Sequence, residues 1–351
     1  MVDDVYLRLR EFLDRMPGGF PETESGIEIR ILEKLFTPEE AGMALRLNGY
    51  PETVPAIAER AGIDETGTAE MLESMARQGS ILRMRHQGRP YYMATSFLVG
   101  IYEFHLKSMD AEFAGLMSEY EPYLTEFWSK IKTKQLRVVP VGEALETDSE
   151  VATYNRIRNM VDKYEDIAVA DCICRVERGL HGHQCERPLE TCLVFGVAAQ
   201  YYCENGIGRK ISVEECHRIL DKAEDAALVL CPSNAQDIVN ICCCCACCCG
   251  MIRSLRTYER PADHVLSSYR AAIDPELCTL CGTCEERCQI EAVIERDGFM
   301  EVDTARCIGC GLCVPTCPEN AVTMVRKPVT EVPPANIVEM NLNILKERGL
   351  A

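Results

Sequence analysis

Two cysteine runs between residues 278 and 317 constrain the fold of this chain more than any other feature. The runs have the same spacing, at i, i+3, i+6 and i+10: Cys278, Cys281, Cys284, Cys288 and then Cys307, Cys310, Cys313, Cys317. This spacing lets a tight loop place three thiolates round one iron–sulfur cube and direct the fourth to a second cube. We therefore assign Cys278, Cys281, Cys284 and Cys317 to one 4Fe-4S cluster, and Cys307, Cys310, Cys313 and Cys288 to the other.

The two runs belong to an internal repeat with an offset of 29 residues, which also aligns Asp274 with Asp303 and Ala292 with Ala321. A duplicated two-cluster ferredoxin explains the repeat. The alternatives are two zinc sites or a disulfide framework, but zinc sites use paired Cys-x-x-Cys knuckles without the regular third and fourth members. Pro318 follows the last cysteine of the second run, whereas Gln289 takes that place in the first. We expect the chain path to differ there and ligation to survive, because proline contributes no ligand.

A second concentration of cysteines lies between residues 172 and 249. Seven of the eight residues from Cys242 to Cys249 are cysteine. In an extended segment alternate side chains point to opposite faces, so only part of this run can bind any one cluster. We predict at least one further iron–sulfur cluster, bound by a subset of Cys172, Cys174, Cys185, Cys192, Cys242, Cys244, Cys245, Cys247, Cys248 and Cys249. A zinc site or reactive thiols are the alternative.

The other polar and thiol groups of this region are assigned weaker roles. We interpret Cys203, Cys216 and His217 as ordinary packing residues, while Cys231 ends a strand and could reach the same pocket. Arg175, His181 and His183 either donate hydrogen bonds to cluster sulfurs or belong to a solvated loop. The pattern predicts a strand over 167–175, a helix that begins at Cys192, and a helix after the capping box that Ser212 opens.

Residues 54–96 are typical of a winged helix-turn-helix. A helix at 54–60, a turn at Gly62, a helix at 65–78 and a hairpin through Gln87-Gly88 follow in order. DNA binding would use basic residues of the wing, Arg83, Arg85, His86 and Arg89. We favour a protein-docking role, because the second helix carries three glutamates, Glu65, Glu70 and Glu73, against Arg77.

Residues 97–134 predict one or two long helices with an aromatic stripe, which we interpret as core packing, together with His105. A short strand is expected over 136–141 and a helix over 151–163. No Gly-rich dinucleotide motif, phosphate loop or nucleophile elbow is found, so a flavin or nicotinamide site is not expected.

Composition bears on compartment and partners. With 22 cysteines and no leader pattern, we expect a cytoplasmic protein of a reducing, anaerobic cell. The apolar stretch 97–106 is interrupted by charged residues, so no membrane span is expected. The net charge of −18 makes nucleic acid an unlikely partner and favours docking to basic patches on redox proteins; a homodimer is left open.

Nearly the whole chain resembles the 4Fe-4S ferredoxin-type proteins of anaerobic and sulfate-reducing microbes. The resemblance is carried by "MPGGFPETESGIEIRILEKLFTPEEA", "CICR", "CERPLETCLVFG", "NICCCCACCCG" and the two cysteine runs. It implies a winged-helix N-terminal domain, a cysteine-rich middle domain and electron transfer, and it implies no substrate. Cys243 departs from the pattern, which has Asn at this position.

Together these features predict a multidomain α+β protein. The expected parts are a winged-helix domain at 1–96, a helical connector at 97–150, a cysteine-rich α/β iron–sulfur domain at 151–262, a ferredoxin domain with two 4Fe-4S clusters at 263–327 and a tail helix at 328–351. We expect an electron carrier or electron-transfer subunit more than a stand-alone enzyme. The alternative functions are a redox-responsive transcription regulator and a catalytic middle cluster that reduces a small disulfide or activates a cofactor.

Overall fold

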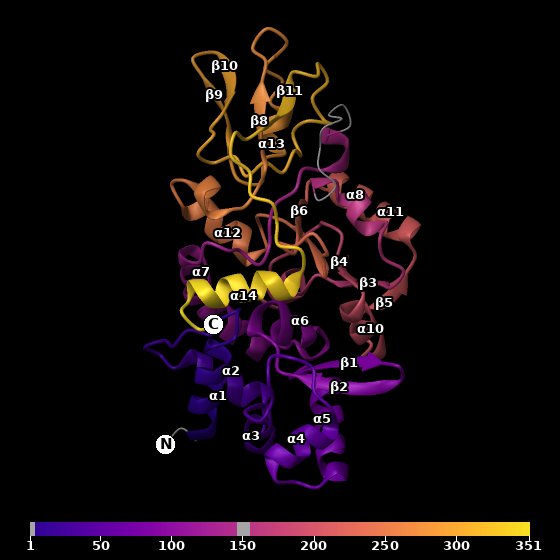
Figure 1. Ribbon diagram of the computed structural model, residues 1–351. Coiled ribbons are helices and arrows are strands. Elements are labelled where there is room, and N and C mark those ends of the chain that lie inside the picture. The colour runs from indigo at the N-terminus through magenta and orange to yellow at the C-terminus, as the bar shows by residue number, and fades with distance from the viewer. Residues whose placement is uncertain (1–3, 146–154) are drawn as a thin grey trace.

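The computed structural model describes residues 4–145 and 155–351. Helices of the N-terminal part lie at one end and the short strands of residues 269–326 at the other, with a five-stranded sheet between them (Figure 1). Two large hydrophobic cores follow this division. One joins the sheet to the C-terminal strands, and the other joins its opposite face to the N-terminal helices.

The N-terminal part is helical and ends in a hairpin. The third helix begins after Thr37, whose side chain and that of Glu40 form a reciprocal capping box. The expected helix pair and hairpin of residues 54–96 are present as elements. The elements are α1 (Asp4–Asp14), α2 (Ile27–Leu35), α3 (Pro38–Ala44), α4 (Val54–Ala61), α5 (Glu65–Gln78), β1 (Leu82–His86) and β2 (Arg89–Met93).

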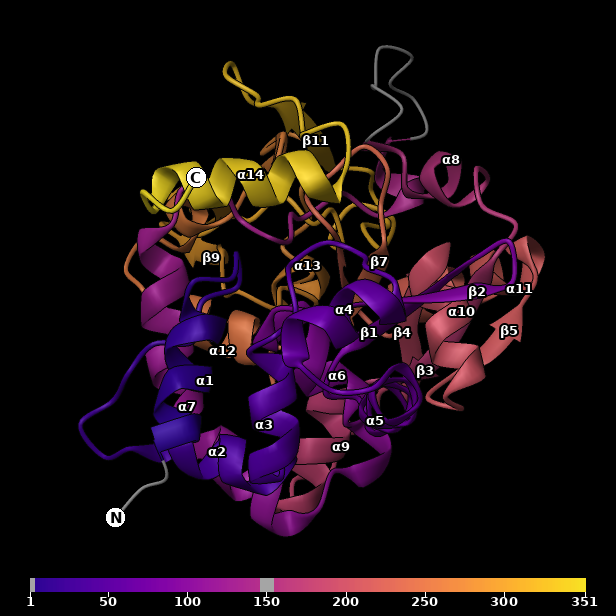
Figure 2. The same ribbon diagram turned by 60° about the horizontal axis from the view of Figure 1, so that its bottom comes forward.

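The hairpin packs against the middle of the chain rather than projecting into solvent. Both views place β1 and β2 beside α10 (Val197–Glu204) (Figures 1 and 2). Arg83 is buried and bonds Glu73 of α5 and Glu204 of α10 at 2.8 and 2.7 Å. Arg85 also bonds Glu204. Two of the four basic wing residues are therefore paired with Glu204, Arg83 in the interior and Arg85 at the surface.

The aromatic stripe of residues 97–128 is core, as expected for its first members. Phe97, Tyr102, Phe113 and Tyr120 are all buried in the N-terminal core. The expected long helix is interrupted, because Val99 and Gly100 leave helical geometry. The elements are η1 (Phe97–Ile101), α6 (Tyr102–Phe104), η2 (Leu106–Ser108) and α7 (Ala111–Lys130).

The central sheet has the order β5-β3-β4-β7-β6, and every neighbouring pair is antiparallel. Its strands are β3 (Ile167–Asp171), β4 (Glu190–Phe195), β5 (Arg209–Ile211), β6 (Val229–Pro232) and β7 (Asn240–Cys244). Side chains alternate between the two cores, with Ile167 and Val169 on one face and Ala168 and Ala170 on the other. Our expectation of an α/β middle domain is wrong in this respect. The chain returns from β3 to β4 at the same end of the sheet, pairing Asp171 with Glu190, so the strands run in opposite directions.

Two expected elements of this region are also corrected. The strand predicted over 167–175 ends at Asp171, and Cys172 caps α9 (Ile173–Leu180). Cys192 lies within β4 and does not begin a helix, because it pairs with Ala170 of β3 and Cys242 of β7; the helix of this segment, α10, begins only after its N-cap Gly196. The remaining helices are α8 (Ile157–Val161), α11 (Val213–Asp225), α12 (Gly250–Thr257) and the short η5 (Pro261–His264).

Three expectations concern residues close to 146–154, the segment between the two described ranges. The predicted strand over 136–141 is reduced to an isolated bridge between Leu136 and Ser233. Of the helix predicted over 151–163, residues 151–154 lie outside the described residues and α8 forms part of the rest. The connector boundary near 150 also lies outside them.

The C-terminal part contains two small two-stranded sheets round the cysteine runs. In the first pair β8 (Tyr269–Ile273) is antiparallel to β11 (Val322–Arg326). In the second, β9 (Val293–Arg296) is antiparallel to β10 (Phe299–Val302). The short helix α13 (Thr283–Glu286) lies within the first cysteine run.

The tail returns across the molecule to the N-terminal part. Helix α14 (Ile337–Glu347) begins at Asn336, whose side chain accepts from the amides of Val338 and Glu339. Arg348 then donates to the carbonyl of Met16 at 2.6 Å. Figure 2 shows α14 lying across the upper side of the molecule, so the tail ties the two ends of the fold together. No described helix is long and apolar enough to cross a bilayer.

Candidate metal centres

The structure gathers Cys278, Cys281, Cys284 and Cys317 round one small cavity. The first three come from a single loop, and Cys317 is contributed by the second run. This is the exchange of the fourth cysteine that the spacing predicts. Cys281 is exposed and Cys284 is buried, so one edge of this centre faces solvent.

The other four thiols of the two runs lie deeper. Burial raises the pKa of Cys310, and the neighbouring thiols of Cys288, Cys313 and Cys307 raise it further. Burial also raises the pKa of Cys307. Several buried thiols side by side are poorly stable as free anions, whereas bound iron neutralises thiolates. The donor set therefore suits an iron–sulfur cluster.

Backbone geometry repeats across the two runs. The amides of Ala292 and Ala321 each donate to the thiol four residues earlier, Cys288 and Cys317, at 3.2 Å. Leu280 and Gly309, which the 29-residue offset aligns, both have positive φ, 59° and 72°. At Gly309 a Cβ atom would lie 2.1 Å from the Tyr269 carbonyl, so only glycine fits. N–H groups that donate to sulfur and loops that curl round the thiols are what a bound cluster requires.

Gln289, which stands where proline was expected, links the cysteine runs to the middle cysteines. Its side chain is buried and accepts from the amide of Ala246 at 3.0 Å. Ala246 interrupts the run 242–249, and Gln289 follows Cys288. The departure from the repeat is therefore a contact between the two cysteine-rich regions.

The middle cysteines come together through strand register. Cys192 pairs with Cys242 on β4 and β7, and Cys242 pairs with Cys231 on β6. These three thiols form a row across three strands, and Cys244 follows Cys242 on the same face. Sequence spacing could not show this row, because its members are up to 50 residues apart.

A first group of thiols lies where this face meets the starts of α9 and α12. We call Cys172, Cys174, Cys244 and Cys249 the cavity thiols. Hydrogen bonds from Cys174 and Cys244 hold the pKa of Cys249 well below its usual value. A hydrogen bond from Cys174 likewise lowers the pKa of Cys172 to about 7. The same bonds to Cys172 and Cys249 raise the pKa of Cys174 well above its usual range. This buried group therefore mixes cysteines that favour the thiolate with one that favours the protonated thiol. A bound cation would stabilise all of them as thiolates.

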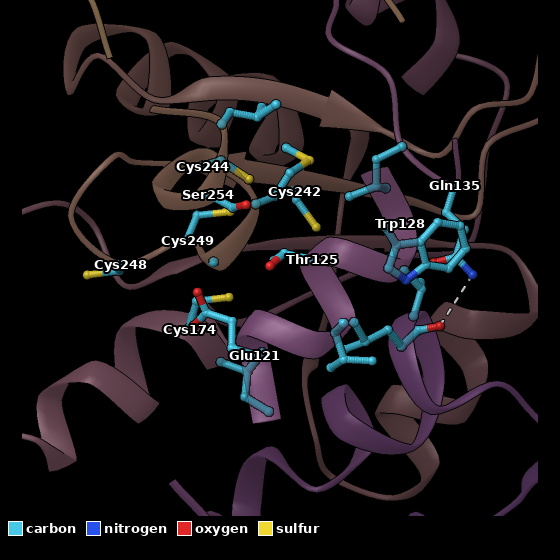
Figure 3. A pocket seen from close by; sticks show the side chains of 18 of the residues that line it. Glu121, Thr125, Trp128, Gln135, Cys174, Cys242, Cys244, Cys248, Cys249 and Ser254 are labelled. Atoms are coloured by element: carbon cyan, nitrogen blue, oxygen red, sulfur yellow. Dashed lines mark hydrogen bonds between the residues drawn. The ribbon is translucent and has the colours of Figure 1, made fainter. Parts of the chain in front are cut away.

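These thiols line a cavity of about 260 Å³ between the sheet and α7. Figure 3 shows Cys174, Cys242, Cys244 and Cys249 near Glu121 and Thr125, with Trp128 farther along α7. Three carboxyl groups also line it. Burial raises the pKa of Glu103 to about 7, and burial raises the pKa values of Glu121 and Glu177.

A second group, which we call the tight quartet, consists of Cys185, Cys245, Cys247 and Cys248. All four sulfurs lie within 4.8 Å of one another. Cys248 points away from the other labelled thiols in Figure 3. Arg187, which the sequence reasoning did not single out, places Nη1 3.5 Å from the Cys247 sulfur.

The remaining predicted groups have other roles in the structure. Arg175 is buried and donates to Thr191 Oγ1 and to the Cys243 carbonyl, at 2.7 and 2.9 Å. Cys192 and Cys242 line the cavity beside the cavity thiols. Cys231 shares a hydrogen bond with Cys244 but does not line the cavity. Sequence reasoning missed the cavity carboxyl groups, because their neighbours come from distant segments.

Comparison with known proteins identifies the C-terminal part. Residues 259–323 match the family described as 4Fe-4S dicluster domain. An uncharacterized ferredoxin of Methanocaldococcus jannaschii is 38% identical over 55 residues, which is 15% of this chain and 33% of that protein. The dihydromethanopterin reductase (acceptor) of Methanosarcina mazei is 38% identical over 61 residues, 16% of this chain and 26% of the reductase.

A third relative is covered over most of its length. Pyruvate synthase subunit PorD of M. jannaschii is 36% identical over 61 residues, 17% of this chain and 71% of the subunit. The chain spans only 33% and 26% of the first two relatives. No solved structure matches the chain significantly. The dicluster domain implies two 4Fe-4S clusters.

Proposed function

Since the chain belongs to the 4Fe-4S dicluster ferredoxin family, we propose that it relays electrons between a partner oxidoreductase and a further iron–sulfur cluster in its middle region. Bound 4Fe-4S clusters supply one-electron carriers. The ligands proposed for the first cluster are Cys278, Cys281, Cys284 and Cys317. Those proposed for the second are Cys307, Cys310, Cys313 and Cys288. We assign the further cluster to the cavity thiols, Cys172, Cys174, Cys244 and Cys249.

One observation carries this proposal: the hydrogen bond from the Ala246 amide to Gln289. It joins the residue after Cys288 to the turn between Cys244 and Cys249. The thiols Cys244, Cys249, Cys284, Cys307 and Cys313 also belong to a single hydrophobic core. This shared burial in one apolar core supports transfer between the proposed second and third centres.

The exposed edge of the first centre is the proposed docking face for the partner. Leu277 and Leu280 beside Cys281 are 51% and 45% exposed. Glu276, Glu285 and Glu286 are exposed round them. An apolar patch with an acidic rim fits a redox protein that presents an apolar patch with a basic rim. We place this exchange in a reducing, anaerobic cytoplasm, because the thiol-rich centres would be oxidised elsewhere.

Freeze-quench EPR of the full chain tests the relay. The anaerobic protein is mixed with a limiting amount of dithionite and frozen at increasing times. The signal of the middle cluster should follow those of the dicluster in the wild type and lag strongly in Cys288→Ser. A middle signal that develops at the same rate in both proteins would contradict the relay.

The cavity favours a second candidate function, in which the middle cluster reduces a small molecule. A space of about 260 Å³ beside the cavity thiols can hold a small organic ligand, and Glu121 and Glu177 could supply protons. A small disulfide R–S–S–R would take two electrons from the clusters and two protons to give two thiols. Adding a small organic disulfide to the reduced protein tests this: reoxidation with stoichiometric thiol release supports it, and unchanged EPR signals contradict it.

The regulator alternative is less well supported. Arg83 is buried and Arg85 is exposed, and both bind Glu204 of α10. His86 and Arg89 are also exposed. Acidic Glu65 and Glu70 are exposed on α5. Salt-sensitive, submicromolar binding to mixed genomic DNA would restore this alternative.

A further inference from the structure

We propose that the tight quartet, Cys185, Cys245, Cys247 and Cys248, binds a single zinc ion, separate from the iron–sulfur clusters. Cys185 comes from the loop after α9, and the other three come from the turn between β7 and α12. The site is therefore built from two segments that are 60 residues apart in sequence. It divides the cysteines expected to share one further cluster into two groups with different occupants.

The size of the quartet supports one ion. The Cys247 sulfur lies 3.6 Å from that of Cys185, 3.4 Å from that of Cys245 and 3.7 Å from that of Cys248. A tetrahedral zinc site with bonds of about 2.3 Å places its sulfurs about 3.8 Å apart. The quartet needs only a small expansion to reach this geometry.

The cluster centres of the same chain give an internal comparison. A cube attaches each thiolate to a different iron, so its four thiolates lie farther apart than those round one ion. Among residues 4–145 and 155–351, the tight quartet is the group of thiols whose sulfurs all lie within 4.8 Å of one another. Neither quartet of the dicluster domain does so, although both have the ligand pattern of a cube. The tight quartet is thus compact in a way that the cube-binding groups are not.

The surroundings suit the charge of such a site. Four thiolates round Zn²⁺ leave a net charge of −2, and binding releases the thiol protons to solvent. Arg187 Nη1 is 3.5 Å from the Cys247 sulfur, and its Nε is fixed by the Ala226 carbonyl at 3.1 Å. This guanidinium offsets part of the charge and orients one ligand.

Four protein ligands leave no open position, which is typical of structural zinc. The ion would fasten the 245–248 turn to the loop that carries Cys185. That turn contains Ala246, the partner of Gln289, and leads directly to Cys249. A redox-inert ion would therefore hold the turn through which the dicluster domain meets the cavity thiols.

The test is metal analysis with zinc X-ray absorption on the full, anaerobically purified chain. We expect about one zinc per chain, with four sulfur neighbours at about 2.3 Å and no iron neighbour. Cys247→Ser should lose at least four fifths of the zinc and keep the EPR signals of the dicluster. Cys203→Ser, a change on α10 outside both thiol groups, should keep zinc and iron.

Zinc below about 0.2 per chain, or zinc with nitrogen and oxygen neighbours, would overturn the proposal. A mononuclear iron–thiolate absorption band lost in Cys247→Ser would overturn the choice of zinc. If Cys247→Ser does not fold, the absorption spectrum of the wild type still decides. Because zinc and iron are counted separately, a missing zinc would leave the electron relay untouched, and a missing middle cluster would leave the zinc site untouched.

Discussion

The dicluster domain and the middle cysteine region bring their cysteine thiols together in different ways. In the dicluster domain, three of the proposed ligands of each cluster come from one short loop, and a duplication supplies the fourth. In the middle region, the thiols come from the ends of β3 and β7, the start of α12 and the loop before β4. The first design is local and repeats in sequence, whereas the second depends on the tertiary fold. Local ligand loops can therefore be recognised from spacing, and the middle centres can be recognised only once strand register is known.

The strongest test of the difference between the two regions is to remove one proposed ligand from each. Cys174→Ser should lose about four of about twelve iron atoms and the middle EPR signal, and it should leave the coupled dicluster signals intact. Cys284→Ser should disturb the dicluster signals and leave the middle one. Iron analysis with EPR of both variants checks this. Loss of all signals in either variant would show that the regions do not assemble independently.

The hairpin contact tests whether the N-terminal part is supported by the middle region. Arg83→Ala leaves Glu73 and Glu204 without their buried partner, so the opening free energy of α5 and the hairpin should fall by about 2–3 kcal/mol. Native-state hydrogen exchange measures it. Arg89→Ala, at an exposed position of the same hairpin, should change it by less than about 0.5 kcal/mol. Equal effects of the two substitutions would mean that the ion pair does not hold the hairpin.

The contact between the two cysteine regions should have a smaller and more local effect. Gln289→Leu leaves the half-buried Ala246 amide without its side-chain acceptor, which costs about 1 kcal/mol. We expect exchange of the Ala246 amide to accelerate severalfold, and transfer to the middle cluster to slow. In the matched control Gln236→Leu, the bond lost is to the Pro333 carbonyl, and Ala246 should exchange as in the wild type. If the Ala246 amide exchanges at the wild-type rate in Gln289→Leu, this hydrogen bond does not hold the two cysteine regions together.

The smallest expected effect concerns His105, far from the thiols in sequence and packed in the N-terminal core. Burial lowers the pKa of His105, so the folded protein holds it neutral while the unfolded chain binds a proton below about pH 6.5. Stability from this residue is present above that pH and is lost as pH falls toward the folded pKa. The contribution of His105 to the free energy of unfolding changes by at most about 1.4 kcal/mol per pH unit. Hydrogen exchange of the N-terminal core at pH 5.5 and 7.5 should show less loss in His105→Gln than in the wild type or in His86→Gln.

The sequence predicted those features that local chemistry determines. The cysteine runs, the N-cap at Ser212 and a helix within the tail 328–351 need only neighbouring residues. It failed at Cys192, whose segment Cys192–Phe195 can be helix or strand and becomes strand by pairing with β3 and β7. It also could not separate Cys185 from Cys172 and Cys174. Those thiols are close in sequence, and only the turn after β7 distributes them between two groups.

Gln289 shows how a departure from a repeat can be informative. By spacing alone it is a missing proline, and the expected consequence was a slightly different chain path. In the structure its amide reaches the middle cysteines. The position that breaks the internal symmetry of the dicluster domain is thus the one that connects this domain to the rest of the chain.

The most direct test of the central claim is iron and acid-labile sulfide per chain, measured on anaerobically purified protein together with EPR of the reduced state. We expect about twelve of each, with a third signal separable from the coupled pair of the dicluster. About eight of each, with no third signal, would contradict the central claim and leave the middle thiols without an iron–sulfur cluster.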